Sequence, residues 1–203
     1  MTPSLEALIL SSIENEASTY LQSEKTPLLY LAIGLLLILT LFTPTPGLTE
    51  EPSEEQKIKA ALIYKLPKFV KWPEEISLFK TFNICLTGTN TLNDSLSVLT
   101  LRRISGKPIT ITYPTHHELK NTHCQLLFIS HSETDQLDKI ISNIGNQHVL
   151  TVSDMPSFAE NGGGIEIHKK GKRLAFRINN AATKRAGLEL SAPLLDMATV
   201  IKR

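Results

Sequence analysis

The stretch QLLFISHSETDQLDKIISNIGNQHVLTVS, residues 125–153, decides the fold class. It opens with a nearly continuous apolar run at residues 125–130, which is typical of a strand covered on both faces. Residues 133–144 then carry apolar side chains at helical spacing and end before Gly145, and VLTVS at residues 149–153 is a second β-rich run. A strand, a helix and a strand in this order predict neighbouring parallel strands joined by a crossover helix.

The same alternation extends upstream of this stretch. Residues 81–87 and 109–113 have the composition of strands, and residues 93–100 between them predict a short helix. Before them, apolar residues recur at helical spacing from Ile58 onward, and Pro67 predicts a kink or an end in that helix.

The pattern changes after residue 154. Two β-rich runs at residues 165–168 and 174–178 flank KKGK, which predicts a hairpin with Gly171 at its turn. Ser191 and Pro193 then mark the start of a last helix. The sequence therefore predicts an α/β fold with a mostly parallel sheet, helices on both faces, and a C-terminal β-hairpin and helix.

The N-terminal region has a different composition. LLYLAIGLLLILTLF at residues 28–42 contains no charge, and as a helix it would reach only about 22 Å, short of the roughly 30 Å hydrocarbon core. Small residues follow at Thr45 and Gly47, which favours a cleaved secretory signal. An uncleaved membrane anchor and a buried core helix are the alternatives. We therefore predict three parts: residues 1–47 as a tail and signal peptide or anchor, 48–56 as a flexible lead-in, and 57–203 as the α/β domain.

The charge balance excludes a class of partner. The whole chain has 21 Lys and Arg against 20 Asp and Glu. Residues 1–47 hold four Glu and one Lys, so the remaining 20 basic and 16 acidic side chains give a net charge of +4. This charge suits solubility but is too dilute for a polyanion, so we expect no nucleic acid as a partner.

No motif predicts a catalytic, cofactor or metal site. Gly162, Gly163 and Gly164 precede a strand, whereas a phosphate-binding loop leads into a helix. The six histidines lack the spacing of metal ligands. Asp154 at the end of a predicted strand is a candidate carboxylate, but a turn residue is the simpler interpretation. We therefore expect no enzyme and no cofactor.

Cys85 and Cys124 are the only cysteines, and export would allow them to pair. They are 39 positions apart, and closing that loop would stabilise the fold by about 4 kcal/mol. If their strands were parallel neighbours, however, the two sulfurs would start at opposite ends. A disulfide and two buried free thiols are both open at this point.

The C-terminal half and the first predicted helix together resemble a known family. The stretches that carry the resemblance are VLTVSDMPSFAENGGGIEI (149–167), LAFRINNAATKRAGLELSAPLLDMATV (174–200) and KAALIYKLPKFVKWP (59–73). This combined pattern, over about residues 56–201, is similar to the YfiR family of small exported regulators. Cys85 and Cys124 also lie where that family places cysteines.

The resemblance implies a non-catalytic α/β protein of the periplasm that acts in biofilm-related signalling. Its implied role is to contact the periplasmic sensor region of an inner-membrane diguanylate cyclase and to lower cyclic-di-GMP synthesis. It also implies control through the redox state of Cys85 and Cys124 and through homodimerisation, and an outer-membrane lipoprotein as a further partner.

A protein that acts by binding needs exposed apolar contacts on a rigid frame. Phe158 in a polar loop is either an anchor in the protein's own core or an aromatic contact for a partner. We expect Phe158, Ile165, Glu166 and Ile167 to contact the partner. The rival hypothesis is a periplasmic module that binds a small molecule at the carboxyl edge of the strands, near Gly88 and Asp154.

Overall fold

The computed structural model describes residues 52–89, 92–171 and 173–201, and these lie in a compact unit that spans residues 51–203. The predicted signal peptide or anchor at residues 1–47 lies outside the described residues. Within the described ranges, no helix is both long and apolar enough to cross a membrane.

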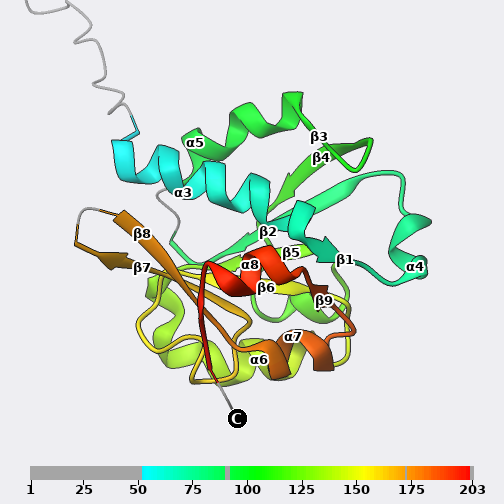
Figure 1. Cartoon of the computed structure of the whole chain (residues 1–203). Coiled ribbons are helices and arrows are strands. Elements are labelled where there is room, and N and C mark those ends of the chain that lie inside the picture. The colour runs from blue at the N-terminus through cyan, green and yellow to red at the C-terminus, as the bar shows by residue number, and fades with distance from the viewer. Residues whose placement is uncertain (1–51, 90–91, 172, 202–203) are drawn as a thin grey trace, which may run out of the picture. The chain divides into compact units, whose positions relative to one another are not determined.

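Strands form the centre of the fold. They are β1 (Val70–Lys71), β2 (Phe82–Thr87), β3 (Arg103–Ile104), β4 (Lys107–Thr112), β5 (Leu126–Ile129), β6 (Leu150–Ser153), β7 (Ile165–Lys170), β8 (Arg173–Ile178), β9 (Glu189–Leu190) and β10 (Thr199–Val200). Eight of them make one sheet in the order β10-β8-β7-β6-β5-β2-β4-β3 (Figure 1), and β1 pairs with β9 separately. Within the large sheet only β3–β4 and β7–β8 are antiparallel.

Six helices connect or cover these strands in the described part of the chain. They are α3 (Glu54–Lys65), α4 (Glu74–Ser77), α5 (Asn93–Ser97), α6 (Leu137–Ile144), α7 (Asn180–Arg185) and α8 (Ala192–Asp196). Short 3₁₀ helices occupy Leu66–Phe69, Val98–Leu101, Glu118–Lys120 and His131–Gln136.

Helices cover both faces of the sheet, as predicted, because the central strands are apolar on both sides. In β2, Ile84 and Leu86 pack with α3 and α5, whereas Cys85 packs with α6. The four residues of β5 are all buried and divide between the same two clusters. Figure 1 shows α3 and α5 on one side of the sheet and α6 on the other. The predicted α/β fold class is confirmed.

The first helix begins earlier than the sequence suggested. Ser53 caps α3 by accepting a hydrogen bond from the backbone of Gln56, and the Gln56 side chain accepts one from the Ser53 backbone in return. Residues 54–56 are therefore helical and not part of a flexible lead-in. At its other end α3 stops at Lys65, just before Pro67, as predicted.

The C-terminal elements also follow the prediction. The hairpin pairs β7 with β8 from Ile165 opposite Ile178 to Lys170 opposite Arg173. Gly171, at a φ of +62°, begins the turn. Asn179 caps α7 by accepting a hydrogen bond from the backbone of Ala182. The hairpin extends the sheet beyond β6 and lies beside the start of α3, where Lys169 contacts Glu55. A surface groove forms between the hairpin and α3.

Candidate partner-binding surface

The four side chains expected to contact a partner lie in the interior. Phe158, Ile165, Glu166 and Ile167 are each at most 1% exposed. Ile165 and Ile167 point to the α3 side of the sheet and Phe158 packs on the α6 side. The expectation that these side chains are exposed is wrong, because the loop before β7 folds under the sheet and both faces of β7 are covered.

The loop with Gly162, Gly163 and Gly164 packs closely against Phe158. A Cβ at Gly163 would collide with the Phe158 ring, and a Cβ at Gly164 would lie 2.9 Å from the carbonyl oxygen of Thr151. The loop is therefore a close-packed turn before a strand, as the order of its residues suggested. Phe158 is an anchor in the protein's own core.

Glu166 is a buried charge with a matched partner. Its Oε1 accepts a hydrogen bond of 2.5 Å from Nη1 of Arg177, and its Oε2 accepts one of 3.4 Å from the Ala159 backbone. Asn179 donates to the carbonyl oxygen of the same Ala159 at 2.8 Å. These contacts fasten the Phe158 loop to the hairpin, so the role of Glu166 in this structure is structural.

An exposed apolar groove lies between α3 and the hairpin. It has a volume of about 630 Å³. Ile58 and Leu62 of α3 form one wall, and Leu174 and Phe176 of β8 form the other. Ile58 is 44% exposed. A groove of this size and character is a ready binding surface for apolar side chains of a partner.

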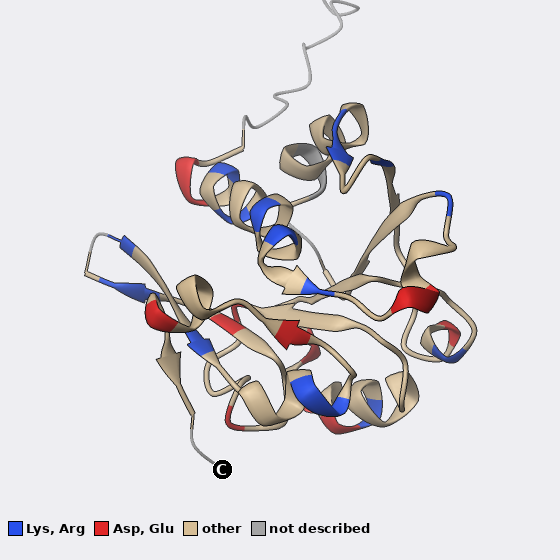
Figure 2. Ribbon diagram, turned by 45° about the vertical axis from the view of Figure 1, so that its right-hand side comes forward, with Lys and Arg blue, Asp and Glu red and all other residues tan. Residues whose placement is uncertain are grey.

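Charges surround this groove in a balanced way. Glu54, Glu55, Lys169 and Arg173 line its rim. Figure 2 shows the acidic start of α3 facing the basic hairpin, and Nζ of Lys169 lies 2.5 Å from Oε2 of Glu55. The rim carries two positive and two negative side chains, so the groove favours an apolar contact over a strongly charged one.

An ion network holds α3 beside the hairpin. Nζ of Lys59 lies 2.6 Å from Asp154 Oδ2 and 2.9 Å from Glu55 Oε1. Burial disfavours the charged form of Lys59, but hydrogen bonds to Asp154 and Glu55 outweigh burial and raise its pKa. Hydrogen bonds from Lys169 and Lys59 lower the pKa of Glu55. Asp154, the carboxylate considered for a ligand, is engaged by this network.

A disulfide joins Cys85 to Cys124. The sequence left a disulfide and two buried free thiols open, because parallel neighbouring strands would start the two sulfurs at opposite ends. β2 and β5 are indeed parallel neighbours, with Cys85 opposite Leu127. Cys124, however, precedes β5 in a segment that turns onto the α6 side of the sheet, where both cysteines pack in one cluster. Their Cα atoms are 5.7 Å apart as a result.

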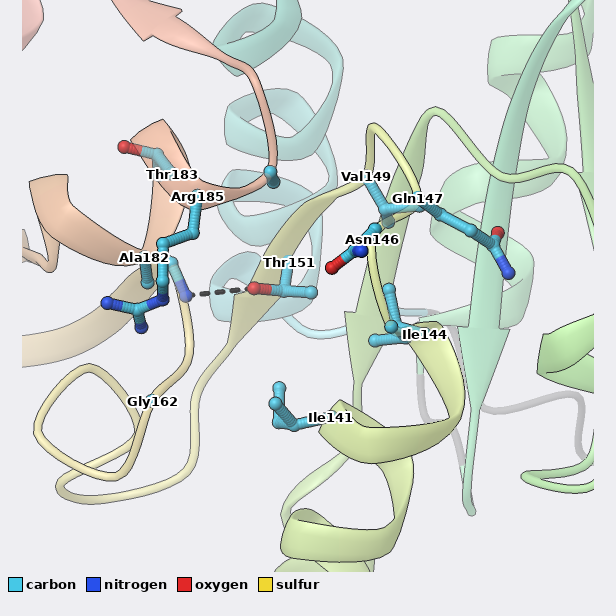
Figure 3. Close-up of a pocket in the computed structure, with 13 residues that line it drawn as sticks. Ile141, Ile144, Asn146, Gln147, Val149, Thr151, Gly162, Ala182, Thr183 and Arg185 are labelled. Carbon is cyan, nitrogen blue, oxygen red and sulfur yellow. Dashed lines mark hydrogen bonds between the residues drawn. The ribbon is translucent and has the colours of Figure 1, made fainter.

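A smaller pocket of about 150 Å³ lies between the end of α6, the glycine loop and α7 (Figure 3). Its central polar group, the Thr151 hydroxyl, already accepts a hydrogen bond of 2.8 Å from the Gly164 backbone. Among the described residues, no group of three or more His, Cys, Asp or Glu is arranged to hold a metal ion.

A model of the YfiR/HmsC-like family matches residues 56–199. The chain belongs to the YfiR/HmsC-like family. The match covers β1 to β9 and the first residue of β10, and with them both helical layers and the hairpin. The resemblance stated from the sequence is thereby confirmed.

A solved structure supports the fold of this YfiR/HmsC-like chain. A conserved domain protein from Vibrio cholerae O1 biovar El Tor strain N16961 is similar with a TM-score of 0.50 and 12% identity, over 72% of this chain and 60% of that one. An ABC domain in complex with L-Trp from Streptococcus pneumonia has a TM-score of 0.49 and 11% identity over the same shares. The chain thus spans 60% of the length of each. The comparison with curated proteins found no match.

Sequence reasoning missed the groove residues. Ile58 and Leu62 were assigned to a buried helix stripe, and Leu174 and Phe176 to an ordinary hairpin. The hairpin tip is rich in Lys and Arg, so apolar side chains on its adjoining strand were the available signal. These four side chains form one surface only in the folded chain, where α3 lies beside a hairpin that follows about 110 residues later in the sequence.

Proposed function

We propose that this protein binds the periplasmic sensor region of an inner-membrane diguanylate cyclase and lowers cyclic-di-GMP synthesis without catalysing a reaction itself. The observation that carries the proposal is the family match over residues 56–199. The regulatory role of the family requires a binding surface, and the groove between α3 and the hairpin supplies one.

The groove supports this role through its chemistry. Its walls are apolar, with Ile58 and Leu62 on one side and Leu174 and Phe176 on the other, and Lys169 pairs with Glu55 at the rim. Apolar side chains of the sensor region would displace water from these walls, which is the main source of free energy in protein association. The contact would also fix α3 relative to the hairpin, because the two walls belong to different elements.

Phe158 and Ile165, which the sequence analysis placed at the interface, are unsuitable positions for testing this proposal. Polar replacement of Phe158 or Ile165 would place a polar group in the core, and lost repression would then report unfolding. Residues of the groove can be changed with less damage, since Ile58 is already partly in water.

The test compares variants in cells that lack the native gene. Deletion is expected to raise cyclic-di-GMP, and the wild-type chain to restore the low level. The variant with Ile58→Asp and Leu174→Asp is expected to fold, to reach the periplasm and to fail to repress. Leu101→Asp is the matched control, because Leu101 is 89% exposed and does not line the groove.

Two results would contradict the proposal. Repression by the folded double variant at the wild-type level would exclude the groove as the contact. An unchanged cyclic-di-GMP level after deletion would exclude the regulatory role itself. The homodimer and the outer-membrane lipoprotein implied by the resemblance are part of this proposal, and sedimentation and cross-linking of the purified chain with each partner test them.

A further inference from the structure

A third pocket lies at the carboxyl ends of the parallel strands. The chain runs from β2 outward to β4, then returns to the other side of β2 to form β5 and β6. The direction of strand addition therefore reverses at β2. In open α/β sheets, the crevice beyond the strand ends at such a reversal is where ligands bind.

This pocket has the size of a small-molecule site, at about 350 Å³. The end of β2 supplies Gly88, the segment after β4 supplies Tyr113 and His116, and the segment after β5 supplies Glu133. Three connections that are distant in sequence thus meet in one place. None of them contributes to the α3–hairpin groove.

Glu133 is the charged group of this pocket. Its side chain is 15% exposed, and it is the only Asp, Glu, Lys or Arg among the described residues that line the pocket. Its Oε2 lies 3.2 Å from Nδ1 of His116, but this contact lacks hydrogen-bond geometry. Within the described ranges, no Lys or Arg lies within 4.0 Å of the carboxylate. A carboxylate that is only 15% exposed, with the His116 ring beside it and no Lys or Arg partner in the described part of the chain, favours a cationic ligand.

Gly88 allows this arrangement. A Cβ at Gly88 would lie 2.6 Å from Cγ of Glu133 and 2.6 Å from Oγ of Ser132, and the glycine has a φ of +90°. Only a glycine at position 88 therefore lets the end of β2 approach Glu133 so closely. The Tyr113 side chain, which also lines the pocket, is 55% exposed, so its ring is available to contact a cation or an alkyl chain.

We propose that the pocket formed by Gly88, Tyr113, His116 and Glu133 binds a small organic cation with a primary ammonium group and a short apolar chain. The ammonium group donates hydrogen bonds to the Glu133 carboxylate, and the apolar chain contacts the Tyr113 ring. This site is independent of the proposed contact with a cyclase.

The test uses three probes with the same carbon skeleton: butylammonium, butanol and butyrate. They are titrated at neutral pH into the purified protein, and the amide resonances of Gly88 and His116 are followed by NMR. Butylammonium is expected to shift both resonances in a saturable way at millimolar concentration. Butanol and butyrate are expected to leave them unchanged.

Two variants complete the test. Glu133→Gln keeps the shape of the side chain and removes its charge, and we expect it to weaken butylammonium binding about tenfold or more, as for loss of a hydrogen bond to a charged group. Asp135→Asn is the control, because Asp135 is exposed on the same segment and does not line the pocket. Equal binding by butanol, unchanged binding by Glu133→Gln or an equal loss in Asp135→Asn would each overturn the proposal.

Discussion

Lys59 and Asp154 are 95 residues apart in the sequence, and Nζ of Lys59 lies 2.6 Å from Oδ2 of Asp154. This contact joins α3 to the end of β6. Through Glu55, which also contacts Lys59 and Lys169, the same network reaches the hairpin. The position of α3, and with it one wall of the groove, is therefore set by charged groups as well as by Ala60 and Ile63 in the core.

The network gives stability a defined pH dependence. The pKa of Glu55 is lowered from its ordinary value of 4.5, so its contribution is complete above pH 4.5 and is lost as the pH falls further. The pKa of Lys59 is raised from 10.5, so its contribution is complete below pH 10.5. We expect Lys59→Met to lower the melting temperature at pH 7, and this gap to narrow as the pH falls below 4.5.

Thermal unfolding from pH 3 to pH 8 checks this expectation. Lys57→Met is the control, since Lys57 is exposed on the same helix and has no ion pair among the described residues. A gap between wild type and Lys59→Met that stays constant down to pH 3 would show that the loss comes from packing and not from charge.

The disulfide is expected to stabilise the fold substantially. It closes a loop with a sequence separation of 39, for which constraint of the unfolded chain gives about 4 kcal/mol. Replacing both Cys85 and Cys124 with Ala should lower the free energy of unfolding in urea by about this amount. Thr112→Ala, which removes a hydroxyl 3.2 Å from Cys85 Sγ, should cost much less. Equal losses in the two variants would refute the cross-link as the source.

Arg177 is expected to stabilise the fold by pairing with the buried charge of Glu166. Arg177→Met leaves a carboxylate that is 1% exposed without its charged partner, and breaking such a pair costs about 3–5 kcal/mol. Adding Glu166→Gln should recover part of the loss, because the buried charge is then gone. Arg173→Met, on the same strand but exposed, should have little effect. Denaturant titration of all four proteins gives the comparison.

Phe158 and Gly163 are expected to be energetically coupled. Phe158→Ala should cost about 3–5 kcal/mol through the cavity it leaves. Gly163→Ala should also be destabilising, because the new Cβ collides with the Phe158 ring. In the double variant the collision disappears, so the combined loss should be smaller than the sum of the single losses. Additive losses would show that the two sites do not contact each other.

Local pattern was sufficient to predict the elements that depend on few neighbours. The apolar run of β5, the helical spacing of α6 before Gly145 and the β7–β8 hairpin were all found from the sequence. The two-residue strands β1 and β9 were missed, because their pairing of Val70 with Leu190 depends on the tertiary fold.

The site was harder to predict because the position of each part depends on how a loop turns relative to segments that are distant in the sequence. Phe158 has the same sequence context whether its loop turns inward or outward, and only the packed structure shows that it turns inward. Cys124 lies close to Cys85 because the segment before β5 turns away from the direction of that strand. Sequence spacing alone does not predict this turn. A pocket does lie at the carboxyl edge near Gly88, but Asp154, which the sequence analysis named with Gly88, does not line it.

The burial of the cross-link has a kinetic consequence. Cys85 is fully buried and Cys124 is 5% exposed, so an attacking thiolate in solution has no approach to either sulfur while the α6 layer is in place. Reduction must therefore wait for a transient opening of that layer, whose frequency is set by local stability. We therefore expect reducing agents to open this pair only as fast as the α6 layer itself opens, so that local stability on that face sets the pace of any redox response.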